Sequence, residues 1–150
     1  MTRKAYTSAH AAKEPWLPVL RGLVRTYQAF ATCSGRHVGS LGLTLAQFDV
    51  VSTLGNTSGM TFKDLGERTL ITKGALTGII DRMEKKGLVR RVASREDRRS
   101  MLAQLTPKGE TLFEAVFPAH VHYLRDRFMR LTEPERKELV RLLKKLKDAM

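Results

Sequence analysis

Basic side chains are concentrated between Thr72 and Ser100, where their number suggests contact with phosphates. This segment holds nine Lys or Arg residues against four acidic residues, so its local net charge is +5. The 150-residue chain as a whole has 27 Lys or Arg, 15 Asp or Glu, and a formal net charge of +12. An excess of this size predicts a polyanionic partner, and nucleic acid is favoured over an anionic membrane surface.

A predicted helix over 73–86 carries part of this charge on one side. Its other side is apolar, with Leu76, Ile79 and Ile80 at helical spacing. A shorter helix over 62–68 precedes it, and a short turn joins the two, as in a helix-turn-helix. In such a unit the second helix enters the major groove and presents its N-terminal side chains to base edges. The expected DNA contacts on these helices are Thr61, Lys63, Thr72, Lys73, Thr77 and Arg82.

The segment SREDRRSMLAQL, residues 94–105, changes abruptly from charged residues to an alternating apolar pattern. An apolar stretch over 88–92 precedes it, so 88–92 and 101–105 are expected to pair as a two-stranded hairpin with a charged tip. A solvated turn is the alternative, but a tip that follows a helix-turn-helix is well placed to reach a minor groove. We expect Asp97 to orient an adjacent guanidinium. The tip arginines expected to contact DNA are Arg95, Arg98 and Arg99.

Threonines mark the expected starts of several helices. Thr44 with Gln47 and Thr132 with Glu135 match the capping box, in which each side chain satisfies an unpaired amide of the first turn. Thr106 is followed by a proline, whose fixed φ suits the first helical position. The chain therefore reads as four helices, two strands and two helices, a mainly α fold with a small β-hairpin. The expected helices are 16–38, 45–54, 62–68, 73–86, 107–130 with a kink near Pro118, and 133 to the end.

Few residues suit catalysis or metal binding. Cys33 is the single cysteine, which excludes an intramolecular disulfide and a zinc site built from several cysteines. It is either core filler or, if exposed with a lowered pKa, a peroxide-sensing thiol. His120 and His122 point in divergent directions on a helix, and GMTFKDLGE is not a phosphate-binding loop. We therefore expect no enzymatic activity, no cofactor and no metal.

The chain also lacks the sequence signals of a membrane protein. No apolar run approaches the roughly 18 residues needed to span a bilayer. The basic N-terminus has no apolar stretch behind it that would make a signal peptide. We therefore expect a cytoplasmic protein without a membrane partner.

Three segments together resemble the MarR family of bacterial transcriptional regulators. ITKGALTGIIDRMEKKGLVRR is similar to the family's recognition helix and first wing strand, DRRSMLAQLTPKGE to its wing and the next helix start, and LTLAQFDVVSTL to the helix before the DNA-binding unit. The resemblance extends over nearly the full chain. It implies a single winged helix-turn-helix domain over 1–150, with a DNA-binding lobe at about 44–105 and dimerisation helices at about 16–38 and 107–150.

The resemblance implies a homodimer in which the first helix and the last two interlace. The sequence agrees independently, because the last two helices carry apolar stripes that a monomer of this length would struggle to cover. A two-fold dimer reads a pseudo-palindromic duplex whose half-sites lie about one helical turn apart. The residues of these stripes are Leu139, Leu142, Leu143 and Leu146 on the last helix and Leu112, Val116, Val121 and Leu124 on the helix before it.

The resemblance further implies a repressor that a small aromatic carboxylate or phenolic ligand releases from DNA. The alternative is a non-specific or architectural DNA-binding protein without a ligand response, which the net charge also supports. Arg25 or Arg36 would pair with a carboxylate and Phe48 would stack on a ring, although Phe48 and Trp16 also suit an ordinary core. The expected ligand-binding residues are Trp16, Arg25, Arg36, His37 and Phe48.

Overall fold

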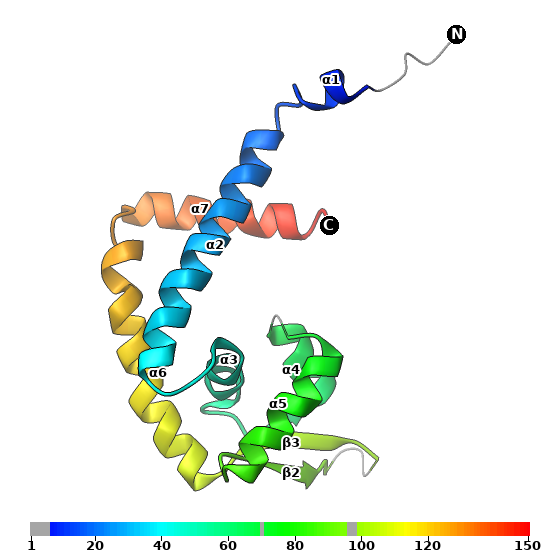
Figure 1. Ribbon diagram of the computed structural model, residues 1–150, viewed down its shortest axis with the longest axis vertical. Helices are drawn as coiled ribbons and strands as arrows, with labels where there is room; N and C mark the ends of the chain where they lie inside the picture. Colours follow the sequence, from blue (N-terminus) through cyan, green and yellow to red (C-terminus); the bar gives the residue numbers. More distant parts are fainter. Residues whose placement is uncertain (1–6, 70, 96–98) are drawn as a thin grey trace.

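The computed structural model describes residues 7–69, 71–95 and 99–150 and places a layer of long helices beside a smaller mixed lobe (Figure 1). Two residues of the expected wing tip, Asp97 and Arg98, lie outside the described residues. The helices are α1 (Ser8–Ala11), α2 (Leu17–Ser40), α3 (Leu45–Leu54), α4 (Phe62–Arg68), α5 (Lys73–Lys85), α6 (Pro107–Phe128) and α7 (Glu133–Lys147). The strands are β1 (Met60–Thr61), β2 (Val89–Ala93) and β3 (Met101–Leu105).

The predicted helix starts at Thr44 and Thr132 are confirmed by their hydrogen bonds. The amide of Gln47 donates to the Thr44 hydroxyl at 3.2 Å, and the Gln47 side chain accepts from the Thr44 amide at 3.1 Å. The Glu135 carboxylate accepts from the Thr132 amide at 2.7 Å, and this bond holds the pKa of Glu135 below its usual value. Both boxes satisfy amides that have no partner within the helix itself.

The sheet corrects the prediction of a two-stranded hairpin. β2 and β3 pair antiparallel as expected, with Arg91 opposite Ala103, but β1 adds a third strand on the far side of β3. Gly59 allows this pairing because its φ is +98° and a Cβ there would lie 2.8 Å from the Ala103 carbonyl oxygen. A strand of two residues has no detectable alternation, so the apolar pattern could not reveal it.

The core joins the lobe to the end of α6 that follows β3. α3 contributes Val50, Val51 and Leu54, which are buried against the apolar face of α5 and the inner side of the sheet. Phe113 and Val116 on α6 complete this core, so Val116 is not part of an exposed apolar stripe, and α6 continues through Pro118 as one helix. Among the described residues, no helix is long and apolar enough to cross a membrane.

The start of α6 depends on a close backbone approach at Gly109. A Cβ at this position would overlap the carbonyl oxygen of Leu88, which belongs to the turn after α5. We expect Gly109→Ala to lower the free energy of unfolding by about 1–3 kcal/mol, because α6 would have to shift away from the lobe. Urea unfolding followed by circular dichroism at one fixed protomer concentration measures this.

Gly39→Ala is the matched control for this prediction. Gly39 also lies in a helix, and a Cβ there would have open space around it. Since alanine favours helix over glycine, the control should leave stability unchanged or raise it by up to about 1 kcal/mol. Equal effects of the two substitutions would contradict the role of the Gly109 approach.

Candidate nucleic-acid interface and adjoining cavity

α4 and α5 form the predicted helix-turn-helix, and each begins at a capping threonine. The hydroxyl of Thr61 accepts from the Asp64 amide at 3.1 Å, and that of Thr72 accepts from the Ala75 amide at 3.4 Å. α5 buries one face in the core and leaves the other in solvent. Its buried residues are Leu76, Ile79, Ile80 and Met83, and its exposed N-terminal and outward residues are Thr72, Lys73, Thr77 and Arg82.

The β2–β3 hairpin extends from the lobe beside α5 and ends in the charged tip (Figure 1). Arg95 and Arg99, which flank the undescribed part of the tip, are both exposed. Along β2, Arg90 is held toward the partner strand because its Nε donates to Oε1 of Gln104 at 3.0 Å. Lys63 is likewise exposed on α4, whereas Thr61 is half-buried. Both line one cavity together with Lys73 and Thr77 of α5.

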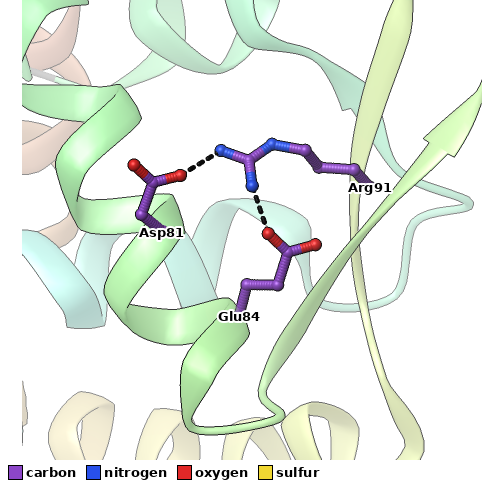
Figure 2. A network of polar contacts seen from close by, with 3 residues as sticks. All are labelled: Asp81, Glu84 and Arg91. Carbon is purple, nitrogen blue, oxygen red and sulfur yellow. Dashed lines mark hydrogen bonds and ion pairs between the residues drawn. The ribbon is translucent and has the colours of Figure 1, made fainter.

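Arg91 contacts two carboxylates and an aromatic ring within the lobe. Its guanidinium donates to the carboxylates of Asp81 and Glu84, one turn apart on α5 (Figure 2). The same guanidinium lies 5.5 Å from the centre of the Phe62 ring on α4. The bond to Asp81 is the main reason that the pKa of Arg91 lies above its ordinary value. Sequence reasoning counted Arg91 only as one more cation.

A cavity of about 600 Å³ lies between α2, α6 and the lobe. Aromatic rings from all three regions line it, so one molecule inside it would touch the helical layer and the lobe together. Its polar lining residues come from four helices. The aromatic residues are Tyr27, Phe30, Phe48 and Phe117, and the polar ones include Ser34, Asp49, Ser52, Arg68 and His120.

Two polar residues of α3, Asp49 and Ser52, line this cavity. Burial raises the pKa of the Asp49 carboxyl. The hydroxyl oxygen of Ser52, three residues further along α3, is buried and has no hydrogen-bond partner among the described residues. A buried polar group of this kind is costly unless a ligand or water satisfies it.

A histidine pair joins α2 to α6, and one member, His120, lines the cavity. Nδ1 of His37 lies 2.9 Å from Nδ1 of His120, and Nε2 of His120 lies 2.9 Å from the Ser34 hydroxyl. The ring of Phe48 meets His120 edge-on at 4.7 Å between centres. Burial, with a smaller contribution from His37, lowers the pKa of His120. Through these contacts His120 links the long helices to α3.

The residues expected to bind a ligand are only partly brought together. Phe48 lines the cavity, and His37 adjoins it through His120. Trp16, Arg25 and Arg36 do not line it, and Trp16 is 54% exposed at the start of α2. Among the described residues, the cation that lines the cavity is Arg68 at the end of α4. This role was not predicted from the sequence, because that helix was assigned to DNA contact alone.

Cys33 lies half-buried on α2 and contacts α6 rather than the cavity. Its thiol donates to the Tyr123 hydroxyl at 3.6 Å. This bond is the main cause of the raised pKa of Tyr123. The contact adds a second polar link between α2 and α6, beside the pair of histidines.

Comparison with known proteins agrees with this geometry. A sequence profile of the MarR family matches residues 41–100. The HTH-type transcriptional regulator MhqR of Bacillus subtilis is 30% identical over 124 residues, which are 83% of this chain and 86% of MhqR. The chain belongs to the MarR family. This MarR-family chain is accordingly a DNA-binding transcriptional regulator with a winged helix-turn-helix fold.

Two solved structures extend the similarity. AbsC of Streptomyces coelicolor, a MarR family transcriptional regulator, superposes with a TM-score of 0.79 at 27% identity over 99% of this chain and 97% of AbsC. BpsR of Bordetella bronchiseptica has a TM-score of 0.75 at 29% identity over 87% of this chain and 98% of BpsR. The DNA binding of BpsR is regulated by 6-hydroxynicotinic acid.

The position of Arg95 gives a test of the wing. Arg95→Ala should weaken binding to every duplex and reduce the slope of log affinity against log salt by about 0.9, because one fewer phosphate would be neutralised. Fluorescence anisotropy with a labelled duplex, over a salt range of about 50 to 200 mM, measures both the affinity and the slope.

Two further variants control this measurement. Lys137 is equally basic but lies on α7, paired with Glu133 at 2.6 Å, so Lys137→Ala should leave the slope unchanged. Thr77→Val, on the exposed face of α5, should change which sequence is preferred and leave the slope intact. An Arg95→Ala slope equal to that of the unmodified protein would remove Arg95 from the interface.

Proposed function

We propose that this protein is a homodimeric repressor that binds a pseudo-palindromic operator and is released from it by a small aromatic ligand. The observation that carries the DNA-reading role is the two-sided nature of α5, whose apolar face is buried while Lys73 and Thr77 stay exposed. The charged hairpin beside it supplies a second contact for an adjacent groove. Repression would follow because a bound dimer occludes the promoter.

Exposed apolar side chains on the long helices support the homodimer. The N-terminal half of α2 and one side of α7 expose large apolar residues, which soluble monomers rarely gather in one continuous area. Leu23 of α2 and Leu143 of α7 line one shared groove, so the two helices present these residues together. The exposed residues are Val19, Leu20, Leu23, Val24, Leu139, Val140, Leu142 and Leu143.

Selection of bound sequences from a random duplex pool tests this function. We expect a pseudo-palindrome whose half-sites lie about 10 base pairs apart, because a two-fold dimer presents two copies of α5. The selected duplex should bind at least about a thousandfold more tightly than random duplex at the same salt concentration. Sedimentation equilibrium of the DNA-free protein should give twice the 16.9 kDa protomer mass.

Equal affinity for all sequences would instead identify a non-specific or architectural binder. The net charge of +12 favours that second candidate, since it would attract any duplex. A protein that stays at the protomer mass at micromolar concentration would contradict the dimer and the palindrome together.

The cavity supports the ligand response. Its volume lies within the range of about 300–1,000 Å³ that is usual for small-molecule sites, and its walls are largely apolar and include aromatic rings. Since it is bounded by the helical layer and by the lobe, a bound molecule would fix the angle between them. That angle sets the distance between the two copies of α5 in a dimer, and a changed distance no longer matches the operator.

Arg68 is the proposed partner of a ligand carboxylate, in the role that the sequence suggested for Arg25 or Arg36. We expect 4-hydroxybenzoate to raise the melting temperature of the DNA-free protein and to weaken operator binding. Arg68→Gln should weaken binding of this ligand by about tenfold or more, because a charged hydrogen bond contributes about 1.5–3 kcal/mol. Isothermal titration calorimetry measures the affinity.

Arg36→Gln is the matched control, because Arg36 is exposed on α2 outside the cavity lining. It should bind 4-hydroxybenzoate as the unmodified protein does. If Arg36→Gln loses binding and Arg68→Gln keeps it, the ligand site lies elsewhere than in this cavity.

A further inference from the structure

Arg91 connects three elements of the DNA-binding lobe through one side chain. It extends from β2, pairs with Asp81 and Glu84 on α5, and lies over Phe62 at the start of α4 (Figure 2). The side chain is 27% exposed, while those of Asp81 and Glu84 are 49% and 39% exposed. A planar guanidinium with two carboxylates and a ring around it has a fixed direction, unlike a lysine at the same place.

The apolar face of α5 and the inner side of the sheet share one core. Met83 of α5 and Val89 of β2 are buried there, close to the turn that joins the two elements. Further along, a cavity of about 750 Å³ opens between α4, α5 and the start of β3, with Lys73, Thr77 and Met101 in its lining. Arg91 also lines this cavity, and its bonds to Asp81 and Glu84 bridge β2 to α5 beside it.

Arg91 also neutralises part of the negative charge on α5. Asp81 and Glu84 are the acidic residues of the helix that reads DNA, and unpaired carboxylates near phosphates oppose binding. With Arg91 bound, the three groups carry a net charge of −1, from two carboxylates and one guanidinium. Without it they would carry −2, and both carboxylates would be free to turn toward the duplex.

We propose that Arg91 is a positioning residue for operator recognition: it fixes the wing relative to α5 and holds Asp81 and Glu84 away from DNA, without itself contacting phosphate. This inference rests on the proposed reading of an operator by α5 and the wing. It reassigns one of the nine cations between Thr72 and Ser100 from the interface to its support. The orientation of the wing then sets which adjacent groove the tip can reach.

Arg91→Met tests the proposal, since methionine keeps much of the side-chain volume without the charge or the hydrogen bonds. The selected operator should bind about tenfold more weakly relative to random duplex, comparable with one mismatched base pair in the site. The slope of log affinity against log salt should stay unchanged, whereas a lost phosphate contact would reduce it by about 0.9. Arg91→Lys should restore affinity for random duplex but not the operator preference, because lysine returns the charge without the planar guanidinium that binds both carboxylates.

Arg90→Met is the matched control on the same strand, where Arg90 pairs with Gln104 instead of α5. It should leave the ratio of operator to random affinity unchanged. Asp81→Asn with Glu84→Gln breaks the same cluster from the side of α5 and covers the case in which Arg91→Met does not fold. This double variant should bind random duplex more tightly and still lose operator preference.

Hydrogen exchange of the DNA-free protein gives a readout independent of operator binding. In Arg91→Met, amides in β2 and β3 should exchange faster, while those of α3 and α6 should be unaffected. Unchanged exchange in the strands would overturn the positioning role even if the operator function holds. A reduced salt slope with an intact operator preference would also overturn it and identify Arg91 as a phosphate contact. Absence of operator preference in the unmodified protein would overturn the proposed function instead.

Discussion

The division of α5 into two faces is the constraint on which the rest of the structure depends. Leu76, Ile80 and Met83 are almost completely buried, so this helix cannot rotate without exposing the centre of the core. Removing large apolar side chains from such positions costs about 2–5 kcal/mol each, a large share of the stability of a small domain. The exposed face is therefore presented at a fixed angle, as reading a groove requires.

The helical layer has a different relation to the lobe. Apart from the start of α6 and Val38 near the end of α2, it meets the lobe around a cavity lined by apolar and polar side chains. Hydrogen bonds of His120 to His37 and Ser34 hold α2 and α6 together beside this cavity. Contacts around a cavity define an angle less rigidly than a close-packed core does. This arrangement suits a joint whose angle a ligand could change, while the reading unit itself stays intact.

Local features were predictable because they depend on neighbouring residues. The capping boxes at Thr44 and Thr132, the start of α6 after Thr106 and both strands of the hairpin follow from side chains within a few positions of each other. The short strand β1 was not predictable, since its pairing with β3 depends on Gly59 bringing two distant segments together. The short α1 was missed as well, because its four residues are too few to show a helical period.

The sequence by itself determined the element order, the basic reading face and the amphipathic pattern of α5, because composition and spacing act within one helix or strand. Only the tertiary structure decided which charges are used internally and which side chains share the cavity. His37 meets His120 across 83 residues. Arg91 reaches α5 because Gly87, with φ of +70°, turns β2 back along that helix. Arg68 lines the cavity because of the way α4 packs, and no local sequence pattern predicts that packing.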